Sequence, residues 1–294
     1  MDDLETRELR YFLTVAEELH FGRAAARLGM SQPPLSRAVR QLEQRIGVDL
    51  FVRDPRGVRL TTAGAVLVGE ARSALAAVAA AGRRTRRAGL PTRHLVLAVK
   101  AGADHELLQA LLDVHGADPD GLQIEVLFGE VHEQAAFLRD GRADVALMHR
   151  TYDDLTGFDT EDLRTEEQVA ILPRTHPLAA RESLVQDDLR DLPDLPAARW
   201  PRPDGSYPDG PGPEVRSQAQ LAQLVALSRT VIVIPRSSRT LQWPEHVAVP
   251  VRDAQLATTV VAWPAGSTSP DVARVVRNAV LAAALVSSDA VPTA

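Results

Sequence analysis

The sequence predicts an α/β protein of two parts, and three observations support this fold class. Helical patterns near the N-terminus lead into a short hairpin pattern. From residue 95 onward, short apolar runs alternate with amphipathic helical patterns, which favours a parallel sheet. Residues 1–90 hold 15 arginines and 10 acidic residues, whereas the rest hold 18 basic and 29 acidic ones, giving a net charge of −6. A basic head on an acidic body is typical of a protein that binds nucleic acid through the head alone.

Composition narrows the class of protein further. Hydrophobic residues make up 45% and charged residues 24%, as in soluble globular proteins. The chain has no run of eighteen apolar residues, so we expect no membrane span. The start of the chain is acidic where a signal peptide would be basic, which favours the cytoplasm. With no cysteine, disulfides and thiol catalysis are excluded.

The first domain, residues 1–60, is predicted to be a winged helix-turn-helix. Residues 8–19 have the spacing of a first helix, and Gly29 ends a second one. Ser31 caps the next helix, whose first turn accepts prolines because its N–H groups have no intrahelical partner. That helix runs to Gly47, and a turn-rich, arginine-tipped hairpin follows over residues 49–60.

Polar and cationic side chains gather at the start of this third helix and on the hairpin. Amides and guanidinium groups read base edges in the major groove, and hydroxyls and cations contact phosphates. An alternative for the first of these residues is that they only shape the helix start. The candidate DNA-binding residues are Ser31, Gln32, Pro33, Pro34, Ser36, Arg37, Arg40, Arg53, Arg56 and Arg59.

A long helix is predicted over residues 61–89. Its alanine-rich apolar stripe would be exposed on a single chain, so we expect it to pair with a second copy. A run of arginines follows at 83–87. One interpretation is that it contacts DNA phosphates, and the favoured alternative is that it forms a solvated helix end.

The remaining residues, 93–294, are predicted to form a two-lobed domain of the periplasmic-binding-protein type. The first lobe covers about 93–160 and 264–294, and the second about 161–263. Expected strands are 95–99, 122–128, 143–148, 169–172, 231–234 and 256–263, the last of which could return to the first lobe, and expected helices are 106–114, 132–140, 183–190, 217–226 and 270–286.

At several motifs the chain resembles the LysR-type transcriptional regulators. These motifs are Arg-Tyr-Phe-Leu-Thr-Val-Ala-Glu (10–17), Ala-Ala-Ala-Arg-Leu (24–28), Ser-Gln-Pro-Pro-Leu-Ser-Arg (31–37), Gln-Leu-Glu (41–43) and Leu-Phe-Val-Arg (50–53). The resemblance implies a winged helix-turn-helix, a dimerising linker helix and an effector-binding domain. It also implies a homodimer or homotetramer, double-stranded operator DNA as a partner, and RNA polymerase as a further one.

One segment departs from that family. Residues 194–214 alternate prolines with glycines, so no helix can run through them. We therefore expect a second lobe shortened by about one helix, with an altered pocket wall on that side.

A ligand is expected in the crevice at the carboxyl ends of the strands. In the family that the chain resembles, the loop after the first strand often binds a carboxylate of the ligand. Lys100 and Arg150 could supply the positive charge for such a carboxylate. The alternative, held as equally good, is that both are ordinary surface cations. Glu130 and His132 stand where many members of that family have a serine or threonine at the helix start after the second strand. A cationic ligand, a ligand of mixed charge and an empty cleft therefore remain as alternatives. The candidate effector-binding residues are Lys100, Ala101, Gly102, Ala103, Glu130, Val131, His132, His149, Arg150, Thr151, Trp200 and Arg202.

The sequence favours a DNA-binding transcriptional regulator that responds to a small molecule. The alternative is a ligand-independent regulator whose C-terminal domain serves only oligomerisation. We find no phosphate loop and no nucleophile elbow, and the histidines at 105, 132 and 149 lack the close spacing of metal ligands. We therefore expect no enzyme activity, no cofactor and no metal.

Overall fold

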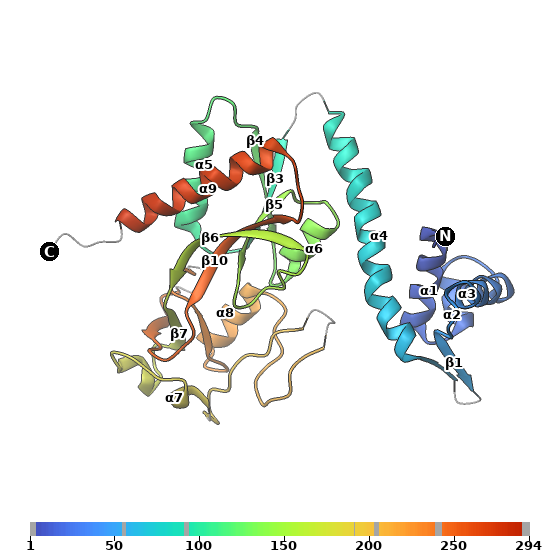
Figure 1. Cartoon of the computed structure of the whole chain (residues 1–294). Helices are drawn as coiled ribbons and strands as arrows, with labels where there is room; N and C mark the ends of the chain where they lie inside the picture. The colour runs from blue at the N-terminus through green and yellow to red at the C-terminus, as the bar shows by residue number, and fades with distance from the viewer. Residues whose placement is uncertain are drawn as a thin grey trace. The chain divides into compact units, whose positions relative to one another are not determined.

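The computed structural model shows an N-terminal helical part and a C-terminal α/β part (Figure 1). It describes residues 4–54, 57–90, 94–190, 192–202, 206–238 and 243–289. The chain divides into two compact units. The N-terminal unit comprises residues 1–86 with 139–141, and the C-terminal unit comprises residues 87–138 with 142–294.

The N-terminal unit is a winged helix-turn-helix, as the sequence predicts. Phe12, Leu35 and Leu42 are fully buried and form the centre of its core. Strands β1 and β2 pair antiparallel as the wing. The elements are α1 (Thr6–Glu18), α2 (Phe21–Arg27), α3 (Gln32–Ile46), β1 (Phe51–Asp54), β2 (Gly57–Leu60) and α4 (Thr62–Ala88).

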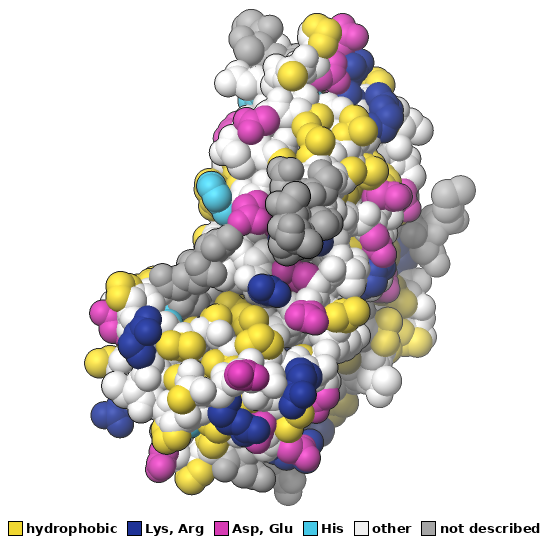
Figure 2. All heavy atoms as spheres, turned by 90° about the vertical axis from the view of Figure 1, so that its left-hand side faces the viewer, with side chains coloured by type: hydrophobic (Ala, Val, Ile, Leu, Met, Phe, Trp, Pro, Cys, Tyr) yellow, Lys and Arg dark blue, Asp and Glu magenta, His cyan; other side chains and the backbone are white. Residues whose placement is uncertain are grey.

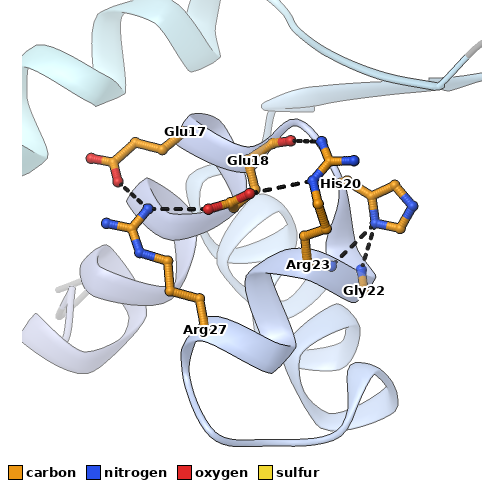
Figure 3. A network of polar contacts seen from close by, with 6 residues as sticks. All are labelled: Glu17, Glu18, His20, Gly22, Arg23 and Arg27. Atoms are coloured by element: carbon orange, nitrogen blue, oxygen red, sulfur yellow. Dashed lines mark hydrogen bonds and ion pairs between the residues drawn. The ribbon is translucent and has the colours of Figure 1, made fainter.

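Ion pairs between α1 and α2 fix the first two helices of this unit (Figure 3). Arg27 Nη1 lies 2.9 Å from Glu17 Oε2 and 3.3 Å from Glu18 Oε1. Arg23 Nε donates to Glu18 Oε2 over 3.3 Å. His20 Nδ1 accepts from two backbone N–H groups in the first turn of α2, at 3.0 and 3.2 Å, and so caps that helix. These exposed pairs orient α2 more than they stabilise it, because each contributes only about 0–1 kcal/mol.

Helix α4 packs Leu67, Ala71 and Leu75 on the N-terminal core but leaves other apolar side chains exposed within the single chain. Val66 is 63% exposed and Val78 49%. By length and composition alone α4 is apolar enough to cross a membrane, with a mean hydropathy of 1.4 over an 18-residue window that is 17% buried. An exposed apolar face of this length calls for a partner surface.

The first lobe of the C-terminal unit is a five-stranded sheet with helices on both faces (Figure 1). The strand order is β4-β3-β5-β10-β6; β3 is parallel to β4 and β5, and β10 is antiparallel to β5 and β6. Helices α5 and α9 share one core with the odd-numbered residues of β3, and α6 shares another with the even-numbered ones. The elements are β3 (His94–Lys100), α5 (His105–Gly116), β4 (Gln123–Gly129), α6 (Glu133–Arg139), β5 (Val145–His149), β6 (Phe158–Glu166), β10 (Ala257–Pro264) and α9 (Pro270–Asp289).

The second lobe is built on a three-stranded sheet of order β8-β7-β9, with both neighbours antiparallel to β7. Among the described residues between α7 and α8 there is no helix, only single bridges that join Ala197 to Val231 and Arg199 to Glu214. The predicted shortening of this lobe is therefore seen. The elements are β7 (Gln168–Pro173), the 3-10 helix η1 (Pro177–Ala180), α7 (Asp187–Arg190), α8 (Gln218–Ala226), β8 (Ile232–Pro235) and β9 (His246–Pro250).

The lobe boundaries differ from those read in the sequence. Strands β6 (Phe158–Glu166) and β10 (Ala257–Pro264) both belong to the first-lobe sheet, so this lobe runs past residue 160 and resumes before residue 264. The strand expected over 256–263 does return to the first lobe. Of the helix expected over 183–190, only the last turn forms, as α7 (Asp187–Arg190). Strand β6 carries no continuous apolar run, because it is an edge strand with exposed and half-buried residues interspersed, and so it gave no strand signal.

Candidate functional site

Helix α3 presents its N-terminal half to solvent while its apolar stripe is buried. Ser31 is an extended N-cap residue, and prolines occupy the first turn. Leu35 and Val39 face the core. The predicted residues on the outer side are exposed at Ser31, Gln32, Pro33, Arg37 and Arg40, and half-buried at Pro34 and Ser36. The geometry thus leaves amide, hydroxyl and guanidinium groups together on one helix end, as groove reading requires.

Arg53, a predicted DNA-contact residue of the wing, is anchored by contacts to α2 and α3 while 28% of its side chain stays exposed. Its Nη2 lies 3.1 Å from Glu43 Oε2, and its Nη1 donates to Ser36 Oγ over 3.3 Å. The guanidinium also stacks 4.5 Å from the ring centroid of Phe21. Glu43 Oε1 accepts from two backbone N–H groups at the entry to β1, at 3.0 and 3.1 Å. Arg53 and Glu43 therefore fix the wing against α3.

The other two wing arginines have different outcomes. Arg59 is 67% exposed in its side chain and pairs with Asp54 at 2.9 Å. Arg56 lies outside the described residues.

Figure 2 shows the face of the protein that is on the left-hand side of Figure 1. Acidic and basic side chains are interspersed with apolar ones on this face, so neither sign of charge dominates there.

A cavity of about 230 Å³ lies at the carboxyl ends of β3, β4 and β5, between the two lobes. The structure brings seven of the predicted effector residues into its lining, namely Lys100, Gly102, Ala103, Val131, His132, His149 and Trp200. Eight further lining residues were missed in the sequence, namely Tyr152, Gln218, Leu221, Ile232, Val233, Ile234, Pro235 and Ser238. Most of the missed residues come from the second lobe and supply an apolar wall.

The other predicted effector residues do not line this cavity. Arg150 turns to Asp162 and Thr160 at the sheet surface, with 48% of its side chain exposed. Thr151 Oγ1 donates to a backbone carbonyl in the loop before β10, over 3.2 Å. Arg202 is exposed, and its backbone N–H donates to the carbonyl of residue 206 over 2.7 Å. Ala101 is half-buried beside the cavity residues.

Glu130, also predicted, bridges the lobes instead of lining the cavity. Its Oε2 accepts from the backbone N–H of Gln218 at the start of α8, over 3.2 Å. Its own backbone N–H donates to Glu133 Oε2 over 2.8 Å. The carboxylate of Glu130 thus occupies a helix N-terminus of the opposite lobe.

The cavity floor holds a cluster of ionisable groups. Burial, and then the charge of Lys100, lowers the pKa of His149 to about 4, so its imidazole is neutral at neutral pH. Burial raises the pKa of Asp153, but hydrogen bonding with His132 and the charge of Lys100 outweigh it and bring that pKa down to about 2. Burial raises the pKa of Tyr152 to about 12. This cluster therefore combines one ammonium, one buried carboxylate beside the lining and two imidazoles, of which that of His149 is neutral at neutral pH.

In the part of the chain that the structure describes, no three His, Cys, Asp or Glu side chains are grouped as metal ligands. His105 does not line the cavity, whereas His132 and His149 do. The cluster is arranged to hydrogen bond and to balance charge, which suits binding of a small molecule.

Comparisons with known proteins identify both parts of the chain. Residues 6–65 match the family described as bacterial regulatory helix-turn-helix protein, lysR family, and residues 88–284 match the LysR substrate binding domain. The chain is 36% identical over 205 residues to the HTH-type transcriptional regulator AlsR of Bacillus subtilis. That alignment covers 67% of this chain and 66% of AlsR, so it spans just under two thirds of the relative's length.

Solved structures show the same architecture along nearly the whole chain. Oxidised OxyR of Corynebacterium glutamicum has a TM-score of 0.51 at 26% identity, covering 98% of this chain and 95% of OxyR. Full-length CbnR in complex with its target DNA has a TM-score of 0.50 at 23% identity, covering 95% and 100%, and shows the fold alone. Since the two family descriptions together match most of the sequence, this chain belongs to the LysR family of bacterial helix-turn-helix transcriptional regulators.

Proposed function

We propose that this chain reads a specific DNA duplex through α3 and that a small molecule in the interlobe cavity modulates this binding. The observation that carries the proposal is the exposed row of Gln32, Arg37 and Arg40 on α3, beside the wing. Amide and guanidinium groups at one helix end match the donors and acceptors of the major groove. The proposal places the protein in the bacterial cytoplasm, with duplex DNA and RNA polymerase as partners.

Self-association belongs to the same proposal. The exposed valines of α4 at 66 and 78 lie on a helix of 27 residues, about 40 Å long. Burying such a face against a second copy removes apolar surface from water at about 25 cal/mol per Å². A dimer then carries two α3 helices, which read half-sites one helical turn apart, or a multiple of that distance. A tetramer adds a second such pair.

The experiment that tests DNA reading uses a duplex selected by the full-length protein from a random library. Arg37→Ala should weaken binding by about 5–150-fold, for a loss of about 1–3 kcal/mol, because one bidentate base contact disappears. Its melting temperature should not change, since Arg37 is exposed. Fluorescence anisotropy at fixed salt gives the affinities.

Arg7→Ala is the matched control. It removes the same charge from the same unit, on α1, where the side chain is 71% exposed. Equal affinities of the Arg37 and Arg7 variants would contradict the assignment of α3 as the reading helix.

A further inference from the structure

The helices that begin at the interlobe cavity carry the chain's own carboxylates at their starts. At α8, the backbone N–H of Gln218 donates to Glu130 Oε2 over 3.2 Å, and that of Gln220 donates to Ser217 Oγ over 3.2 Å. A helix N-terminus is where backbone N–H groups and the helix dipole stabilise a bound anion. At α8 that place is already filled by Glu130.

The starts of the two first-lobe helices also hold acidic side chains, although Asp104 makes no side-chain cap hydrogen bond at α5. In the turn before α6, Glu133 Oε2 accepts from the backbone N–H of Glu130 over 2.8 Å. Asp104 stands at the N-cap of α5 and is 2% exposed, with its Oδ1 2.7 Å from Arg164 Nη2 and its Oδ2 3.2 Å from Thr259 Oγ1. A carboxylate from outside would meet the like charge of Glu130 at α8 and of Glu133 at α6, whereas Arg164 offsets the charge of Asp104 at α5. Like charges at close range repel strongly in a partly buried site.

The side chains of the cavity floor do not restore a positive charge. Lys100 is the one Lys or Arg in the described lining, and the buried carboxylate of Asp153 lies close enough to feel its charge. His132 Nδ1 lies 3.6 Å from Asp153 Oδ1. The imidazole of His149 is neutral at neutral pH. The charges of Lys100 and Asp153 therefore oppose each other, and Glu130 adds a carboxylate at the start of α8.

One side chain in the lining, that of His149, has hydrogen-bonding capacity that the described residues do not meet. His149 is 4% exposed, and among the described residues neither of its ring nitrogens has a hydrogen-bond partner; the nearest carboxylate oxygen of Asp153 is 4.0 Å from Nδ1. A neutral imidazole offers one donor and one acceptor, and leaving both unmet in a buried site is costly. Facing it are the apolar side chains of Trp200, Leu221 and Ile232.

We propose that the effector of this site is a small uncharged molecule, with a donor–acceptor group such as a carboxamide or hydroxyl on His149 and an apolar ring or branched chain on the second-lobe wall. Glu130 is the residue that selects against anions. The cavity volume of about 230 Å³ is below the 300–1,000 Å³ usual for drug-sized ligands, which limits the ligand to about one ring. This inference rests on the function proposed above and specifies the chemistry of its ligand.

The test compares ligands of matched shape and different charge on the full-length protein. The probes are benzamide and isobutyramide, the carboxylates benzoate and isobutyrate, and the amines benzylamine and isobutylamine, each titrated by calorimetry at neutral pH. At least one amide should bind, with its carboxylate and its amine each at least about tenfold weaker. Carboxylate or amine binding as tight as amide binding, or no amide binding at all, overturns the proposal.

Two variants assign the selectivity to named residues. Glu130→Gln keeps an acceptor for the Gln218 N–H and removes the charge, so carboxylate affinity should rise at least about tenfold while amide affinity stays within about twofold. Glu125→Gln removes the same charge from β4, where the side chain is 63% exposed, and should change neither. His149→Phe should weaken amide binding at least about tenfold. An unchanged carboxylate-to-amide ratio in Glu130→Gln overturns the role of Glu130, even if His149→Phe fails to fold.

Failure of this inference differs from failure of the proposed function. If carboxylates bind and amides do not, the protein is still a ligand-binding regulator and only the ligand class is wrong. If DNA binding persists and no probe of any charge binds, the ligand class is overturned, and a wider metabolite screen then decides the ligand half of the proposed function. Loss of the difference between Arg37→Ala and Arg7→Ala concerns the DNA half alone.

Discussion

Two glycines of α4 should respond in opposite directions to the same substitution. A Cβ added at Gly64 would lie 2.2 Å from the backbone oxygen of Leu50 and 2.9 Å from Leu60 Cδ2. Real Cβ atoms essentially never approach closer than 3.0 Å, so the helix start must move away from Leu50. At Gly69, on the exposed side of the same helix, no described atom lies within 4 Å of an added Cβ.

The magnitudes follow from packing and helix propensity. Overpacking against an immobile backbone group costs about 1–3 kcal/mol, and replacing a helical glycine by alanine returns about 1 kcal/mol. With the strain at the top of its range, Gly64→Ala should destabilise the N-terminal unit by about 2 kcal/mol, whereas Gly69→Ala should stabilise it by about 0.5–1 kcal/mol.

Scanning calorimetry of the full-length variants checks this pair. For a unit of this size about 1 kcal/mol moves the melting temperature by about 4–8 °C. Gly64→Ala should therefore lower the first transition by about 8–16 °C, and Gly69→Ala should raise it slightly. If Gly64→Ala melts at or above the temperature of Gly69→Ala, the reasoning that α4 docks on the carbonyl of Leu50 is refuted.

Two further predictions concern buried ionisable groups. Glu43→Ala should destabilise the N-terminal unit by about 2–5 kcal/mol in thermal unfolding, because it leaves two backbone N–H groups without an acceptor and releases Arg53. A loss below about 0.5 kcal/mol would show that these N–H groups are satisfied otherwise. His149 has a folded-state pKa of about 4, below its unfolded value of 6.5, so the unfolded chain binds more protons between those pH values. Stability of the C-terminal unit should therefore fall as the pH drops from 6.5 to 4, by at most about 3 kcal/mol, and His149→Gln should flatten that slope in pH-dependent urea unfolding. An equally steep slope in the variant would assign the effect to another group.

The N-terminal unit is largely readable from the sequence because its signals are local. Gly47 ends α3 with a φ of 82°, and the Ser31-Pro33-Pro34 start is a local helix signal. The pairing of Arg53 was missed because its partner, Glu43, is ten residues away on the buried side of α3, whereas its DNA contact stays a prediction. An acidic residue at an inward position of a predicted helix is the signal that would have indicated an internal ion pair.

The cavity was half predictable. The ends of parallel strands meet at one sheet edge, which correctly gathered Lys100, His132 and His149. Arg150 was grouped with His149, but it lies just beyond β5 and its side chain pairs with Asp162 at the sheet surface instead of lining the cavity. The wall from Ile232 to Pro235 was missed because β8 faces the cavity only through its pairing with β7, which no local pattern encodes.

The central claim is that this protein discriminates DNA sequence through α3, and one titration tests it most directly. The library-selected duplex and a scrambled duplex of the same composition are titrated with full-length protein across a range of salt concentrations. The account predicts affinity at least about 10³-fold tighter for the selected duplex, with log K falling linearly in log salt for both. Equal affinity for the two duplexes, or affinity that does not respond to salt, would contradict it.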